Sequence, residues 1–173
     1  MGERASVLTR SEDQTRALGE ALGRAVQAGD VLLLDGAFGA GKTTLVQGLA
    51  RGLGVADQVT SPSFVIACEY DGRAPLFHID LYRVEQMDGT TLEALAEYFG
   101  GSGVCVVEWP GALPPDLVRD ATRILLRATG ETERQIEIET ASERLRDAFV
   151  AFSTDARALQ RSGGAGHRNH PRH

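Results

Sequence analysis

The chain has 173 residues, 42% of them hydrophobic, so it can bury one sizeable core and has about the length of a single domain. Its 24 acidic residues outnumber its 18 basic ones, and the resulting net charge of −6 argues against a surface that neutralises many nucleic-acid phosphates. Cys68 and Cys105 form no CxxC pair, and the sequence holds neither a membrane-length apolar run nor a signal peptide. A soluble protein of the reducing cytoplasm is therefore expected.

The first part of the chain is predicted to alternate between helix and strand. Apolar residues recur at helical spacing over 18–26, and Ser11 and Gln14 form a capping box ahead of them. A continuous apolar run at 31–34 predicts a strand that is buried on both faces. Apolar positions every fourth residue then predict a helix over 42–54. The order is strand, glycine-rich loop, helix.

The rest of the chain is predicted to contain two hairpins. One pairs strands at 63–70 and 75–82 about an Asp-Gly turn, and the other lies within 122–139. The remaining expected elements are a helix over 92–99, a buried strand over 104–108, and a last helix capped by Thr140 and Glu143. This pattern predicts one α/β domain over 1–160 with a mixed sheet flanked by helices, followed by a disordered tail at 161–173.

The strongest motif lies between the predicted strand and the helix that follows it. Gly36, Gly41, Lys42 and Thr43 satisfy the pattern G-x-x-x-x-G-K-[ST] of the phosphate-binding loop, whose backbone N–H groups wrap around phosphates. Lys42 is the only lysine in the chain, and a compact ammonium fits the phosphate cradle where a planar guanidinium is too wide. Thr43 offers a hydroxyl to Mg²⁺, so the motif predicts a nucleotide site.

Two acidic residues end predicted strands and are candidates for the metal site. Asp80 ends the run LFHID and Glu108 ends the run VCVVE. Ligands of open α/β sheets bind at the carboxyl ends of the strands, beside the phosphate-binding loop. Either carboxylate could hold Mg²⁺, directly or through water, while the other positions the attacking water. His78, on the same strand as Asp80, is interpreted as a packed or hydrogen-bonded histidine rather than a catalytic one.

Four motifs, in their order and spacing, resemble the TsaE (YjeE) family of small ATPases. They are GAFGAGKTT at 36–44, SPSF at 61–64, HIDLYR at 78–83 and VEWP at 107–110. The resemblance covers about residues 10 to 140 and implies a P-loop NTPase-like domain. It also implies an accessory ATPase, with ATP and Mg²⁺ as cofactors, in the synthesis of tRNA threonylcarbamoyladenosine. Such a protein works with TsaD and TsaB and meets tRNA only indirectly, through their complex.

The same resemblance implies roles for particular residues. The implied ATP-binding residues are Phe38, Gly39, Ala40, Gly41, Lys42, Thr43, Thr44, Trp109 and Arg134. The implied catalytic residues are Lys42, Asp80 and Glu108, and the implied Mg²⁺ ligands are Thr43, Asp80 and Glu108. Ser61 and Ser63 would belong to a switch-like segment near the γ-phosphate. The chain departs from the family pattern at Ala37 and Phe38, where an acidic residue and leucine are common, and at Ser63, where threonine is common.

Three functions are compatible with a phosphate-binding loop. The first is the ATPase of a tRNA-modifying complex, and the second is a small-molecule kinase, because the loop itself does not name the phosphate acceptor. The third, a GTP-dependent switch, usually needs an Asn-Lys-x-Asp segment for guanine. The only asparagine is Asn169 and the only lysine lies in the loop, so that segment cannot exist here.

Overall fold

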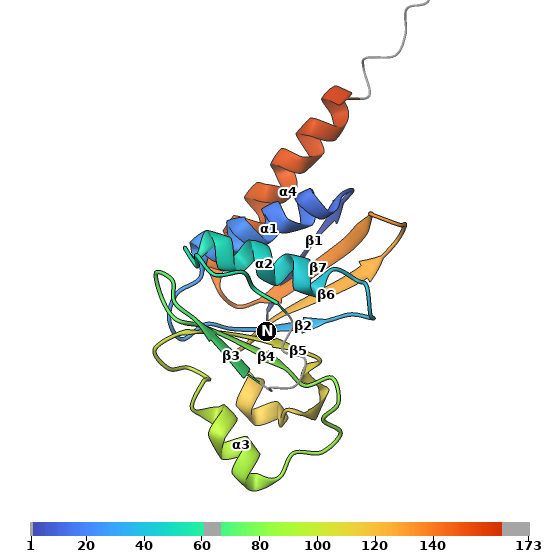
Figure 1. Cartoon of the computed structure of the whole chain (residues 1–173). Coiled ribbons are helices and arrows are strands. Elements are labelled where there is room, and N and C mark those ends of the chain that lie inside the picture. The colour runs from blue at the N-terminus through green and yellow to red at the C-terminus, as the bar shows by residue number, and fades with distance from the viewer. Residues whose placement is uncertain (1, 61–66, 164–173) are drawn as a thin grey trace, which may run out of the picture.

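A computed structural model describes residues 2–60 and 67–163 and shows a single seven-stranded sheet with helices on both faces (Figure 1). Its strands are β1 (Glu3–Thr9), β2 (Val31–Asp35), β3 (Ala67–Tyr70), β4 (Leu76–Asp80), β5 (Val104–Glu108), β6 (Thr122–Ala128) and β7 (Arg134–Thr140). Its helices are α1 (Glu12–Ala25), α2 (Lys42–Gly52), α3 (Gly89–Ala96) and α4 (Glu143–Gly163). Within these described ranges, none of the helices is long and apolar enough to cross a bilayer.

The sheet is mixed, as the two hairpins predict. The strand order is β1-β7-β6-β2-β5-β4-β3. The central strand β2 runs parallel to β5 and β6, and β4 runs parallel to β5. The hairpins β3–β4 and β6–β7 are antiparallel, and β1 pairs antiparallel with β7 at one edge. The carboxyl ends of β2, β4 and β5 consequently share one edge of the sheet, from which the glycine-rich loop leaves β2.

Side chains of the central strands alternate between two hydrophobic cores. Leu32 and Leu34 of β2 belong to the core under α1, α2 and α4, whereas Leu33 belongs to the core shared with α3. Figure 1 shows α1, α2 and α4 on one side of the sheet and α3 on the other. This alternation follows from the period of two in a strand. It also decides which strand-end residues can face α2.

Helices α1 and α2 approach each other closely through glycine. A Cβ on Gly19 would lie 2.2 Å from the Leu45 carbonyl oxygen, and one on Gly48 would lie 2.0 Å from that of Arg16. No real Cβ tolerates such contacts, so glycine at these positions is what allows the two backbones to touch. The contact fixes α2, and with it the loop that precedes α2, against the rest of the domain.

Capping of the helices is partly as predicted. Ser11 is the N-cap of α1 and accepts a hydrogen bond from the Gln14 backbone N–H at 3.1 Å, while the Gln14 side chain accepts from the Arg10 backbone N–H. The prediction that Thr140 caps the last helix is wrong. Ser142 does so, since its Oγ accepts from the Leu145 N–H, because Thr140 is still part of β7.

Other boundaries also differ from the predictions. The edge strand β1 was not predicted, since its first residues, Glu3 and Arg4, are charged and exposed and its partner strand β7 is distant in the sequence. Helix α3 ends at Ala96 rather than near Phe99, and α4 continues to Gly163, beyond the expected start of the tail at 161. The predicted strand at 63–70 is described only from Ala67, where β3 begins.

Candidate functional site

The glycine-rich loop connects β2 to α2 in a conformation that only glycine adopts readily. Gly39 has a φ of 73° and Gly41, the N-cap of α2, has a φ of 99°. Both values lie in the left-handed region, where a Cβ would be strained. The helix begins at Lys42, so its positive end lies at the loop, where backbone N–H groups can face an anion.

Lys42 lies at the centre of the site. Its side chain is 7% exposed, and its ammonium donates to the carbonyl oxygens of Gly36 and Ala37, the latter at 3.3 Å. The Lys42 Nζ also lies 3.8 Å from the centroid of the Trp109 ring, a cation–π contact. Burial lowers the pKa of Lys42, and the charge of Glu108 opposes that shift. The ammonium is thus partly desolvated and close to the strand-end carboxylates.

Asp80 and Glu108 lie side by side at the carboxyl ends of β4 and β5. They are directly opposite in the parallel register. Strand alternation puts both on the face of Leu76 and Val106, which is the face that α2 covers. Burial, and then the charge of Glu108, raises the pKa of Asp80, although Asp80 Oδ1 accepts from the Tyr82 N–H at 2.9 Å. Asp80 and Glu108 therefore lie next to one another, and the charges of both act on Lys42.

A buried histidine supports one of the two carboxylates. His78 is fully buried, Glu108 is 2% exposed, and His78 Nε2 lies 2.9 Å from Glu108 Oε2. Among the described residues, the other ring nitrogen of His78, Nδ1, is buried and has no hydrogen-bond partner. His78 is thus packed and hydrogen-bonded, as interpreted from the sequence, and its partner is the candidate catalytic glutamate itself.

Three aromatic rings form a cluster beside the glycine-rich loop, and one of them, Trp109, lies over Lys42. Phe38 and Tyr82 have ring centroids 4.4 Å apart, and Trp109 lies 5.2 Å from Phe38 and 5.1 Å from Tyr82. Phe38 is 68% exposed, so the cluster forms part of the surface at the mouth of the loop. Trp109 has a φ of 57°, which is uncommon for a residue other than glycine and is typical of functional sites. Tyr82 is a member that sequence reasoning missed, although it lies in the HIDLYR motif.

Arg134 joins the β6–β7 turn to the glycine-rich loop. Its guanidinium donates to the Gly39 carbonyl oxygen at 2.9 Å and to the carbonyl oxygens of Gly130, Glu131 and Glu133 in the turn. The residue predicted as a nucleotide contact therefore lies beside the loop. Its observed partners are backbone carbonyl groups.

The remaining predicted positions fall into two groups. Ala40 is buried within the loop, and Thr43 and Thr44 lie in the first turn of α2, next to Lys42. Ser61 and Ser63 lie outside the described residues.

The donor set suits a hard divalent cation. Two carboxylates meet at the Asp80–Glu108 pair, and Thr43 follows Lys42 at the start of α2. A cation there would relieve the repulsion between the carboxylates, which contributes to the raised pKa of Asp80. In the described part of the chain, no three His, Cys, Asp or Glu side chains cluster as metal ligands, so a cation would need oxygen from a hydroxyl, water or phosphate.

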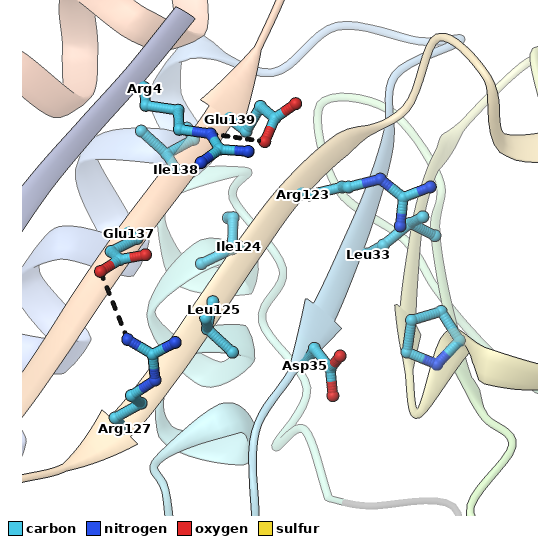
Figure 2. Close-up of a pocket in the computed structure, with 11 residues that line it drawn as sticks. Arg4, Leu33, Asp35, Arg123, Ile124, Leu125, Arg127, Glu137, Ile138 and Glu139 are labelled. Atoms are coloured by element: carbon cyan, nitrogen blue, oxygen red, sulfur yellow. Dashed lines mark hydrogen bonds and ion pairs between the residues drawn. The ribbon is translucent and has the colours of Figure 1, made fainter. Parts of the chain in front are cut away.

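A separate cavity of about 320 Å³ lies on the opposite face of the sheet, lined by side chains of β2, β6 and β7 (Figure 2). Arg4 pairs with Glu139 at 2.9 Å and Arg127 with Glu137 at 3.5 Å along its wall. Leu33 and Asp35 of β2 also line it. The arginines and glutamates of this wall pair with one another, and the cavity is lined by neither Lys42 nor the Asp80–Glu108 pair.

The fold and the site together define a protein class. A glycine loop that leaves the central strand of a mixed sheet, enters a helix at a lysine and faces strand-end carboxylates is typical of an α/β protein with a P-loop NTPase-like fold. The crystal structure of YdiB from Bacillus subtilis superposes with a TM-score of 0.71 at 35% sequence identity, covering 90% of this chain and 98% of that one.

The particular family follows from sequence comparison. The family model described as threonylcarbamoyl adenosine biosynthesis protein TsaE matches residues 9–136, and the chain belongs to this family. The tRNA threonylcarbamoyladenosine biosynthesis protein TsaE of Bacillus subtilis is 40% identical over 137 residues, which are 79% of this chain and 85% of that protein. The protein of the same name from Treponema pallidum is 37% identical over 131 residues, or 76% and 97% of the two chains.

Proposed function

We propose that this chain is a Mg²⁺-dependent ATPase that serves the biosynthesis of tRNA threonylcarbamoyladenosine. The observation that carries the proposal is the meeting of Lys42, Asp80 and Glu108 on the α2 face of the sheet. The relatives' role in this modification supports the choice of process. A cytoplasmic location fits the process and the absence of a membrane-length helix in the described ranges.

The loop and the start of α2 would bind the triphosphate. Backbone N–H groups from Gly39 to Thr44 would surround the phosphates, and positive φ at Gly39 and Gly41 allows the backbone its close approach. Lys42 would exchange its present partners, the carbonyl oxygens of Gly36 and Ala37, for phosphate oxygens. This exchange favours the bound state because an ammonium is stabilised more by anionic than by neutral acceptors.

The strand-end carboxylates and Thr43 would hold the metal. Bound Mg²⁺ supplies neutralisation of the charge on the β- and γ-phosphates. Asp80, which is the less buried carboxylate, is suited to a direct or water-mediated contact with the cation. Glu108 is buried and hydrogen-bonded to His78, so it is suited to orienting the attacking water from a fixed position.

The aromatic cluster and Arg134 would complete the nucleotide site. Trp109 covers Lys42, so its ring lies within reach of a nucleotide whose phosphates bind that lysine. Phe38 exposes its ring beside Trp109. Arg134 supports the carbonyl of Gly39 and brings a positive charge to the loop.

The partners of this ATPase would be TsaD and TsaB, with tRNA reached through them. The net charge of −6 is consistent with a protein that does not itself bind much nucleic acid. We expect slow hydrolysis by the isolated chain and faster hydrolysis with the partners, because a single small domain leaves little room for a second substrate. The kinase alternative has no support from the relatives, which are named as biosynthesis proteins of the same tRNA modification.

Release of labelled phosphate from ATP tests the proposal. The purified chain is assayed with Mg²⁺, with and without TsaB and TsaD, and Lys42→Ala serves as the inactive control. Slow Mg²⁺-dependent release that the partners accelerate supports the proposal. Transfer of the label to an added nucleoside or sugar at several turnovers per second, the usual range for kinases, would contradict it.

A further inference from the structure

The buried ring beneath Glu108 has no role in the function described so far. His78 lies on β4 and Glu108 on the neighbouring parallel strand β5, and both side chains lie on the face that α2 covers. His78 is opposite Val106, so its ring reaches diagonally to Glu108, with 2.9 Å between Nε2 and Oε2. Neither residue is more than 2% exposed. The contact therefore joins two side chains whose backbones the sheet fixes.

The direction of the hydrogen bond follows from the donors available. An ionised carboxylate has no proton to give, so His78 Nε2 carries the hydrogen and Glu108 Oε2 accepts it. The other nitrogen, Nδ1, is buried without a partner among the described residues. A hydrogen at Nδ1 would be an unsatisfied buried donor, which is costly, so the geometry favours a ring hydrogen at Nε2, where Glu108 accepts it. Glu108 thus receives a directed hydrogen bond from His78, while the charge that it interacts with is that of Lys42.

Such a bond restricts the orientation of the glutamate. A glutamate side chain has several rotatable bonds and samples many rotamers when nothing holds its carboxylate. With Oε2 fixed by His78, the position of the second oxygen is determined as well. Groups behind a catalytic or metal-binding side chain often act in this way, and their loss typically costs about 10–100-fold in activity or metal affinity.

We propose that His78 is a positioning residue whose Nε2–H holds Glu108 in the single orientation in which it serves ATP hydrolysis. This inference rests on the proposed ATPase function. It requires no change of protonation at His78. The competing explanation is that the pair merely fills the core, in which case any polar or apolar residue of similar size would serve equally well.

Two substitutions that differ by one methylene test the position of the donor. In His78→Gln the side-chain amide can place its N–H near the position of Nε2, whereas in His78→Asn it is too short to reach Glu108. We expect His78→Asn to lower the turnover about 10–100-fold with nucleotide affinity within about 3-fold of wild type. His78→Gln should restore the turnover to within about 5-fold. Thr122→Val, which removes a buried hydroxyl pair elsewhere in the sheet, is the control for lost stability alone.

Crystal structures of the same variants supply a readout that does not depend on hydrolysis. Glu108 should keep its orientation in wild type and His78→Gln and should move or become disordered in His78→Asn. An unchanged Glu108 in His78→Asn, or equal turnover of the Asn and Gln variants, would overturn the positioning role. If the wild-type protein with its partners releases no phosphate, the ATPase proposal itself fails. The crystal structures would still show whether His78 orients Glu108, so the two failures can be told apart.

Discussion

Two buried polar pairs in the same sheet differ in how their hydrogen-bonding groups are satisfied. Thr122 and Thr140 join β6 to β7 through a hydroxyl–hydroxyl contact of 2.7 Å, and each hydroxyl can both donate and accept. His78 and Glu108 join β4 to β5 at 2.9 Å, but this pair buries a carboxylate and leaves Nδ1 without a partner in the described structure. The first pair is uncharged, and Thr140 Oγ1 also accepts from the Ser142 N–H, whereas the second pair is costly for the fold and lies where the strands meet the glycine-rich loop.

The difference indicates where the molecule gives up stability for chemistry. A buried polar group without a partner, or a buried charge without a counter-ion, destabilises a fold unless something else requires it. Natural proteins tolerate such features mainly at functional sites. The substitutions below compare the strand ends beside the glycine-rich loop with parts of the sheet that lie away from it.

The largest effect is expected at Lys42. Lys42→Ala should weaken ATP binding by about 1,000-fold or more, on the order of 4 kcal/mol, because the loop loses its only cation that reaches the phosphates. Titration with a fluorescent ATP analogue measures this. Lys42→Arg should fail to restore binding, since the guanidinium is too wide for the cradle. Normal affinity in the arginine variant would contradict the geometric role of the lysine.

The next largest effect is expected at Glu108, and it should differ from that of Lys42 in lowering turnover rather than ATP affinity. Glu108→Gln keeps the size of the side chain and should lower the turnover about 100-fold, since the carboxylate no longer orients water, while ATP affinity changes by less than about 5-fold. Single-turnover hydrolysis and equilibrium binding give the two quantities. An equal loss of affinity in the Lys42 and Glu108 variants would show that both act in binding alone.

A smaller effect is expected at Arg134, which supports the loop through the Gly39 carbonyl. Arg134→Ala should weaken ATP binding about 10-fold, or about 1.4 kcal/mol, because the loop loses an anchor and a nearby positive charge. Arg127→Ala is a matched control on the same hairpin, since its exposed pair with Glu137 spans 3.5 Å and contributes little. Equal ATP affinities of the two variants would contradict a role of Arg134 in nucleotide binding.

The structural pair should affect stability without affecting nucleotide binding. Thr122→Val replaces a hydroxyl by a methyl group of similar size and should lower the free energy of unfolding by about 1 kcal/mol. Urea unfolding measures the loss, and titration with the ATP analogue checks that affinity is unchanged. A change in ATP affinity would show that the Thr122–Thr140 pair is coupled to the candidate nucleotide site. The contrast between the two buried pairs would then be weaker.

The smallest effect concerns the face of β5 opposite Glu108. Burial raises the pKa of the Cys105 thiol to about 12, so the thiol stays protonated at pH 7 to 9 and forms the reactive thiolate only at far higher pH. Cys68 is half-buried. A disulfide reagent at pH 8 should label one of the two cysteines quickly in the folded protein and both in urea. Rapid labelling of both in the folded state would mean that β5 opens locally.

Much of the fold could be predicted because local patterns and tertiary structure agree there. The apolar runs of β2 and β5 predict central strands, and the Asp-Gly turn predicts the hairpin of β3 and β4. The loop motif could be interpreted as a candidate nucleotide site from the sequence because the conformation of Gly39 and Gly41 is a local property of the backbone. Strand β1 escaped prediction because its pairing with β7 involves residues more than a hundred positions away.

The glycine-rich loop, its lysine, and the strand ends that carry Asp80 and Glu108 could all be found in the sequence, since these features depend on short-range periodicity and on residue chemistry. Only the folded chain reveals that His78 reaches Glu108, that Phe38 and Tyr82 meet the Trp109 ring that lies over Lys42, and that Arg134 anchors Gly39. These contacts depend on strand order and register, which are set by the packing of the whole sheet.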